Sequence, residues 1–316
     1  AFEAASRACD AAAETWSHEF KLRDVMRIYD FPEQRVNFAV KFPAKKVRPG
    51  GLQLVAIEKD GARPVRFQLS GVVRDGKFLK QATVSFRSDL PKGSDRRFRL
   101  SFDSDRSLPP LDAASTVGVR DVKGGTAVLW ANRLRVRVPH GTRQFQPPVS
   151  PATVPAPILA VARDGKTDGW CLAGSFRCQG GLKVIAMETR VLEQGPLFVR
   201  YRVAYTFDKG QQYIVVLTVE HNERHVTLDE KLGGISPQDE TYLQIDLAGV
   251  DPDRREVMSN GGYGAQGYCG AFDKKLEPDG RVPFELGLNR PNSMGVMRAA
   301  AFYADKGDHS LLFALY

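Results

Sequence analysis

The sequence of 316 residues predicts a mainly β protein with one N-terminal helix, a small β-sandwich and a large antiparallel β-sandwich. Short runs of alternating apolar and polar residues recur along most of the chain, and a period of two is typical of strands with one buried face. Turn sequences rich in Gly, Pro and Asp separate these runs. A helical period appears only near the N-terminus, so we expect a helix over 1–26, the small sandwich over 27–107 and the large sandwich over 108–316.

The predicted N-terminal helix depends on an alanine-rich segment, AFEAASRACDAAAETW. Alanine is the strongest helix former. Apolar residues also recur at helical spacing, at Ala5, Cys9, Ala12, Trp16 and Phe20. One apolar stripe of this kind indicates a helix that packs on a sheet edge or on a neighbouring domain. A helix on a membrane surface would carry more Lys and Arg on its polar face.

The small sandwich is predicted from five alternating runs: VNFAVKFP, GLQLVAIE, PVRFQLSGVV, ATVSFRSDL and RRFRLSFD. Turn sequences lie between them at Pro49–Gly51, Asp60–Gly61, Asp75–Gly76 and Pro91–Gly93. Short strands at regular spacing with such turns are typical of a β-sandwich. The segment Leu108–Pro110 is the expected boundary with the next domain.

The large sandwich is organised around Gly195–Leu232, which predicts three strands joined by two tight turns. The β-branched run Tyr213–Val219 suits a strand that is covered on both faces. Such a meander needs a second sheet on its apolar face. The remaining strands are expected in TAVLWANRLRVRVP, APILAVARDG, GWCLAGSF, LKVIAMETRVLEQ, TYLQIDL and SLLFALY. The proline-rich segment Phe145–Pro157 should lie outside the sheet interior, because proline lacks the ladder donor.

Charge and cysteine content limit the classes of partner. The net charge of +8 favours acidic partners, although an even spread of surface charge is the alternative. No dense Lys/Arg cluster with interleaved aromatic residues occurs along the sequence, which disfavours nucleic acid, and no apolar run reaches the roughly 18 residues of a membrane span. Of the four cysteines, Cys171 and Cys178 flank an expected hairpin and either pair or remain buried thiols.

Several strand and turn phrases resemble a known family. YDFPEQRVNFAVKFPAKKVRPGGLQLV is similar to the opening β-domain of exo-rhamnogalacturonan-lyase-like proteins. The later order NRLRVRVP, APILAVARDG and GPLFVRYRVAYTFDKGQQYIVVLTVEHNERHVTLDE is similar to the large β-supersandwich of polysaccharide lyases and galactose-mutarotase-like proteins. The similarity covers residues 29–247 and implies a carbohydrate-active protein, a lyase that cleaves uronic-acid-containing polysaccharide by β-elimination.

The resemblance also defines the alternative functions and the partners that we expect. Lyases of this kind often add a helical toroid, which this sequence lacks, so we expect a helical partner domain or chain, a longer parent protein, or sugar binding without cleavage. A glycoside hydrolase or an epimerase on the same sandwich is a further alternative. The expected ligand is an acidic polysaccharide or oligosaccharide, and the expected location is secreted or periplasmic. No cofactor is required by the sequence, and a divalent cation is left open.

A lyase needs a base, a group that neutralises the uronate carboxylate, and an acid for the leaving oxygen. His and Tyr can move protons, and Arg pairs with a carboxylate through a planar fork. The catalytic candidates are His140, Arg143, His221 and Tyr263. The substrate-binding candidates are Trp170, Arg202, Tyr205, Asn260 and Tyr268.

Each candidate also has a simpler interpretation. His140 and Arg143 follow a strand, where they line a binding surface or form an exposed loop pair. His221 and His225 bracket a turn, and side chains across a tight hairpin often point to different sides, so no metal site is predicted there. Tyr205 either packs in the core or offers a platform for a sugar ring. Trp130 is expected in the core.

The glycine-rich segment Asn260–Gly270 contains the spacing GYGAQG, which matches a dinucleotide-binding fingerprint. That fingerprint requires a following helix, whereas YCGAFDKKLEPDG has no helical period. We therefore expect a loop that presents Tyr263 and Tyr268 beside a binding surface, with Asn260 adding a hydrogen bond.

Overall fold

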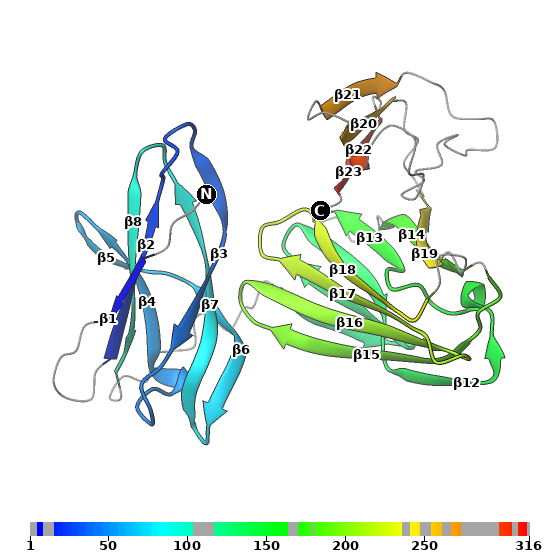
Figure 1. Ribbon diagram of the computed structural model, residues 1–316, viewed down its shortest axis with the longest axis horizontal. Coiled ribbons are helices and arrows are strands. Elements are labelled where there is room, and N and C mark those ends of the chain that lie inside the picture. Colours follow the sequence, from blue (N-terminus) through cyan, green and yellow to red (C-terminus); the bar gives the residue numbers. More distant parts are fainter. Residues whose placement is uncertain are drawn as a thin grey trace. The chain divides into compact units, whose positions relative to one another are not determined.

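The computed structural model describes residues 5–8, 16–103, 117–163, 170–178, 180–235, 241–246, 254–260, 267–272, 297–304 and 309–314. In this part of the chain the protein is mainly β, as predicted: antiparallel strands form five sheets, and the two helical elements are single 3₁₀ turns at Pro49–Gly51 and Pro151–Thr153 (Figure 1). The chain divides into two compact units, Ala1–Ile245 and Asp246–Tyr316.

The predicted N-terminal helix is wrong. Strand β1 (Ala5–Ala8) pairs with β2 (Trp16–Arg23), and β2 pairs in turn with β8 (Asp95–Phe102). Residues four apart share one face of a strand as well as one face of a helix, so the spacing of Trp16 and Phe20 fits both structures. Phe20 and Leu22 are buried on β2. Long-range pairing and this burial outweigh the helix propensity of the neighbouring alanines, which is a weak preference.

Two sheets enclose the first hydrophobic core. One has the order β1-β2-β8-β4-β5, with β4 at Leu52–Glu58 and β5 at Gly61–Pro64. The other has the order β3-β7-β6, with β3 at Phe31–Lys41, β7 at Phe78–Leu90 and β6 at Phe67–Asp75. Ring pairs join the two sheets: Phe20 to Phe38 and Phe86 to Phe98, each with 4.5 Å between centroids. The arrangement is therefore sandwich-like. The predicted boundary at Leu108–Pro110 lies outside the described residues.

Two more sheets enclose the second core. The first, in the order β19-β14-β13-β11-β10-β9, is built from Thr241–Asp246, Trp170–Cys178, Ala160–Arg163, Leu134–Pro139, Thr126–Ala131 and Val117–Lys123. The second, in the order β12-β15-β16-β17-β18, is built from Thr142–Val149, Val184–Gln194, Phe198–Phe207, Gln212–Glu220 and Val226–Gly233. The predicted meander is confirmed as β16, β17 and β18. Phe176 of one sheet lies 4.6 Å from Tyr205 of the other, between ring centroids, so side chains of both sheets fill this core.

The unit Asp246–Tyr316 contains one described sheet of four strands in the order β21-β20-β22-β23. Its strands are β20 (Arg254–Asn260), β21 (Gly267–Phe272), β22 (Met297–Ala304) and β23 (His309–Ala314). The strand expected in SLLFALY is thus present as β23.

One local prediction needs correction, and another is confirmed. The segment expected to be a hairpin, CLAGSFRC, runs as the single strand β14. Cys171 and Cys178 therefore lie about 23 Å apart along an extended chain, too far for a disulfide, whose Cα atoms are at most about 7 Å apart. The proline-rich segment was expected outside the sheet interior, and its first part lies on β12, the edge strand of its sheet. An edge strand tolerates proline because one side of it has no ladder partner.

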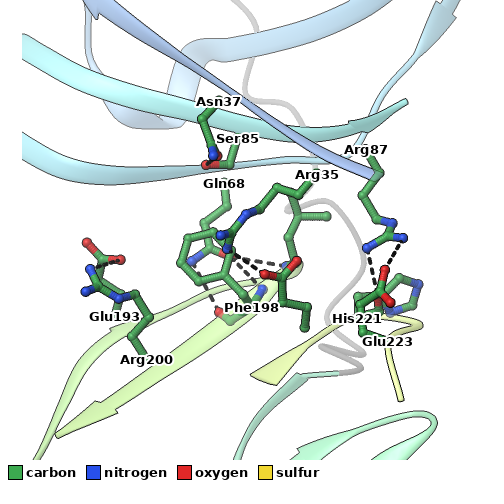
Figure 2. A network of polar contacts seen from close by, with 12 residues as sticks. Arg35, Asn37, Gln68, Ser85, Arg87, Glu193, Phe198, Arg200, His221 and Glu223 are labelled. Atoms are coloured by element: carbon green, nitrogen blue, oxygen red, sulfur yellow. Dashed lines mark hydrogen bonds and ion pairs between the residues drawn. The ribbon is translucent and has the colours of Figure 1, made fainter. Parts of the chain in front are cut away.

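The two sandwiches within Ala1–Ile245 meet at a buried polar junction (Figure 2). The side chain of Gln68 replaces a backbone partner: its Oε1 accepts from the N–H groups of Leu197 and Phe198, each at 3.1 Å, and its Nε2 donates to the Phe198 carbonyl at 3.2 Å. The Arg35 guanidinium stacks on the Phe198 ring at 4.7 Å and pairs with Glu220 at 3.0 Å. The junction therefore satisfies its buried polar groups internally.

Candidate functional site

The predicted residues His140 and Arg143 lie where the chain crosses from β11 to β12, and thus from one sheet to the other. The His140 N–H donates to the Gly125 carbonyl oxygen at 2.9 Å. Gly141, with a φ of 97°, turns the chain, and its N–H donates to Thr189 Oγ1 at 2.8 Å. The position of this crossing is therefore fixed by the β9–β10 turn on one side and by β15 on the other.

The ring of His140 is oriented by Tyr201, a core residue of β16. Tyr201 Oη donates to the Pro139 carbonyl oxygen at 2.8 Å, and His140 Nδ1 lies 3.0 Å from the same Oη. When the phenol donates its single proton to Pro139, its oxygen can accept a proton from His140 Nδ1, and this arrangement favours the imidazole tautomer protonated at Nδ1. Nε2 then holds the lone pair, and no described residue forms a hydrogen bond with it. Burial raises the pKa of Tyr201 and keeps its phenol protonated.

Arg143 lies on β12 and reaches the same turn as His140. Its guanidinium packs against Gly125, since a Cβ on that glycine would lie 2.2 Å from Arg143 Nη2. His140 contacts Gly125 through its backbone and Arg143 contacts it through its side chain, so the structure brings these two predicted residues to one turn. A neutral imidazole with an available lone pair can accept a proton, and a guanidinium can hold a carboxylate. Together they could remove a proton next to a carboxylate.

His221, predicted to act in catalysis, lies instead at the junction of the two sandwiches (Figure 2). Its N–H donates to the Leu197 carbonyl at 2.7 Å, and its own carbonyl accepts from Arg87 Nη1 at 3.1 Å. Burial lowers the pKa of His221, as do the cations Arg66 and Arg87. His221 is therefore part of the structural junction.

Tyr205 and Arg202 lie on opposite faces of β16. Tyr205 is fully buried, and its Oη donates to the Pro155 carbonyl at 2.6 Å. Burial raises the pKa of this phenol strongly. The predicted contact of Tyr205 with a substrate does not fit this position, because a ring inside the core offers no surface to a sugar. Arg202 lies on the outer face, opposite Arg190 in the register and 3.7 Å from Glu188.

Trp170 lies half-buried at the start of β14, and two guanidiniums stack on its indole: Arg137 at 4.1 Å and Arg135 at 5.5 Å. Trp130, expected in the core, is half-buried too, with the Arg120 guanidinium 3.9 Å above its ring. Sequence reasoning missed these three arginines. The alternation in NRLRVRVP was the signal that could have found two of them, because residues 135 and 137 share one strand face while the apolar residues between them face the core.

The remaining predicted residues belong to the second unit. Asn260 ends β20, and Tyr268 lies on β21 opposite Ser259. Tyr263 lies outside the described residues. Asn260 and Tyr268 therefore lie on paired strands and not in the glycine loop expected over Asn260–Gly270, whereas the role of Tyr263 stays a prediction.

No protein family model matches the chain, and no curated protein is significantly similar to it. Among the described residues, no three His, Cys, Asp or Glu side chains gather closely enough to hold a metal ion. The described residues also contain no helix with the length and apolar character of a membrane span.

Proposed function

We propose that the chain is a carbohydrate-active protein, a polysaccharide lyase or the β-portion of one, that cleaves uronic-acid-containing polysaccharide by β-elimination. The observation that carries the proposal is the hydrogen-bond chain from His140 through Tyr201 to Pro139. It favours the tautomer with the proton on Nδ1, in which Nε2 can serve as the base. The family resemblance and the net charge of +8 support the same substrate class.

In this proposal His140 Nε2 takes the proton next to the uronate carboxylate. Arg143, held against Gly125, neutralises the carboxylate and stabilises the charge that develops on it. The electron pair of the broken C–H bond forms a carbon–carbon double bond, and the bond to the leaving oxygen breaks. The imidazolium then returns its proton to that oxygen, so the step needs no second acid. Tyr201 does not touch the substrate and acts by positioning His140.

The sheets of Val117–Asp246 correspond in this proposal to the β-supersandwich, and those before Asp103 to the small N-terminal sandwich. A helical partner, by domain or by chain, and a secreted or periplasmic location belong to the same proposal. Sugar binding without cleavage is a second candidate, favoured by the two half-buried indoles that carry stacked arginines.

The proposed chemistry is tested by incubating the full chain with uronate polysaccharides and following the ultraviolet absorbance of the unsaturated product. We expect His140→Ala to lower kcat by about 10² to 10⁴, the usual contribution of a general base. Tyr201→Phe should lower kcat about tenfold or more with KM unchanged, because the Nδ1 proton loses its acceptor.

Thermal unfolding of both variants controls for loss of structure. Thr153→Ala, which alters an exposed residue of the 3₁₀ turn Pro151–Thr153, serves as the matched control and should keep full activity. A folded wild-type chain that releases no unsaturated product from any uronate polymer would overturn the proposal.

A further inference from the structure

The outer face of the sheet that contains β9, β10, β11, β13 and β14 carries a concentration of cations and indoles. We call it the arginine–tryptophan face, and it is formed by Arg120, Trp130, Arg135, Arg137 and Trp170. Strand pairing places these residues in two neighbouring rows. One row runs Arg120, Val128, Arg137 and Ala160, and the next runs Trp130, Arg135, Ala162 and Trp170. Residues in register on adjacent strands share one face, so the five side chains project together.

The guanidiniums of this face are held in place before any ligand arrives. Arg120 lies 3.9 Å above the Trp130 ring, and Arg137 lies 4.1 Å above the Trp170 ring. Beneath them Val128, Ala160 and Ala162 are buried, with at most 8% of their surface exposed. Because these buried side chains are small, the arginine side chains can lie flat across the surface of the sheet. Stacking on an indole restricts a guanidinium and leaves its N–H edge directed outward.

The arginine–tryptophan face contains no acidic residue at the register positions of its two rows. Arg137 forms no salt bridge within the described part of the chain. Arginines of the small sandwich differ: Arg87 pairs with Glu33 and Glu223, Arg96 with Asp89, and Arg99 with Glu19. The charge of Arg137 is therefore balanced by no described carboxylate, and an anionic ligand could supply that balance.

The spacing of the three arginines on the sheet indicates what kind of anion the face could bind. Arg135 and Arg137 are two residues apart on one strand, or about 7 Å. Arg120 and Arg137 are separated by two strand spacings, or about 10 Å. The backbone positions of the three arginines thus extend over about 10 Å, a span that a chain with a carboxylate on each ring can follow. Single-stranded nucleic acid would need bare aromatic faces for base stacking, and here guanidiniums already cover one face of each indole.

We propose that the arginine–tryptophan face binds a run of carboxylates along a polyuronate chain, anchored by a bidentate contact to Arg137. The inference takes its substrate class from the proposed function, and it assigns a role in binding to residues other than His140 and Arg143. Bidentate pairing requires a guanidinium. Arg137→Lys keeps the positive charge but loses the two parallel N–H donors and the planar group that stacks on the indole.

The test measures binding of an oligogalacturonate to the full 316-residue chain by calorimetry, in a His140→Ala background so that no cleavage intervenes. We expect Arg137→Ala and Arg137→Lys each to weaken binding about tenfold or more, as for loss of a charge-assisted bidentate contact. Arg97→Ala removes an exposed arginine from β8 of the small sandwich and should change binding by less than about twofold. A fully methyl-esterified oligomer, which lacks the charges, should not bind measurably.

Three results would overturn the inference: equal weakening by Arg97→Ala, full retention of binding in both Arg137 variants, or tighter binding of a single-stranded DNA oligomer than of the uronate. Circular dichroism of each variant confirms that it is folded. The inference and the proposed function fail separately. Binding that depends on Arg137 without cleavage by the wild type would contradict the lyase alone, and cleavage with unchanged binding in the Arg137 variants would contradict the face alone.

Discussion

At the scale of single residues, the clearest roles belong to buried polar side chains that accept hydrogen bonds from backbone N–H groups of distant segments. Gln68 takes the place of a strand partner for residues 197 and 198, and Gly195 leaves the room it needs, since a Cβ there would lie 2.5 Å from the Gln68 side chain. Asp24 ties a loop to a distant turn in the same way: its Oδ1 accepts from the N–H groups of Met26 and Arg27, and its Oδ2 accepts from Gly93 at 2.7 Å.

Replacing Gln68 should destabilise the junction. Gln68→Ala leaves two buried backbone N–H groups without acceptors, so we expect the free energy of unfolding to fall by about 2 to 4 kcal/mol. Urea denaturation measures this change. Gln81→Ala alters an exposed glutamine on β7 and should cost little by comparison. Similar losses for the two variants would show that Gln68 does not hold the sandwiches together.

Asp24 should make stability depend on acid pH. Its backbone hydrogen bonds, first that from Gly93 and then that from Arg27, hold the pKa of the Asp24 carboxyl below its ordinary value of 3.8. Because the folded pKa is depressed, the ionised carboxylate stabilises the folded state above pH 3.8, and this contribution is lost as the pH falls through the lower folded pKa.

The stability difference between the wild type and Asp24→Asn should therefore be greatest near neutral pH and should shrink below pH 3.8. Thermal unfolding as a function of pH measures it, with Asp60→Asn in an exposed turn as the control. A difference that stays constant down to pH 2 would mean that the charge of Asp24 has no part in stability.

At the scale of elements, the period-two pattern predicted strands correctly, whereas the alanine-rich pattern predicted an N-terminal helix where the structure has strands β1 and β2. Strands β4 and β16 to β18 lie in the runs that predicted them, and β3, β7 and β8 begin one to five residues before theirs. The N-terminal error arose because residues four apart coincide on a helix and on a strand, and the pairing that decides between them lies with β8, about eighty residues away. Gly174 lies in the middle of β14, in the run GWCLAGSF that predicted a strand.

The role of Gly174 is a close backbone approach. Its N–H donates to the Leu159 carbonyl at 2.9 Å, and a Cβ built on it would lie 1.6 Å from the Ile158 carbonyl oxygen. Gly174→Ala should therefore force β14 away from β13 and lower the free energy of unfolding by about 3 kcal/mol. Gly50→Ala, at a position where a Cβ would meet nothing within 4 Å, is the matched control. Equal stability of the two variants would contradict the close approach.

At the scale of the whole molecule, the sequence predicts which residues have suitable chemistry but not which ones meet. His140 and Arg143 are three residues apart and their association follows from a local turn. Tyr201, which orients His140, lies about sixty residues further on. Trp170 meets Arg137 only because β11, β13 and β14 are neighbours in one sheet. The order of strands in a sheet depends on how the two sheets pack around the shared core. The local alternation of residues shows which face of a strand is buried and says nothing about which strands are neighbours.

The most direct test of the central claim, that this chain breaks uronate polymers by β-elimination with His140 as the base, is mass spectrometry of the products formed in heavy-oxygen water. Elimination predicts fragments with a new double bond and no oxygen from the solvent, together with their loss in His140→Ala. Fragments that carry heavy oxygen would show hydrolysis instead. Intact polymer after incubation with the folded wild-type chain would contradict catalysis altogether.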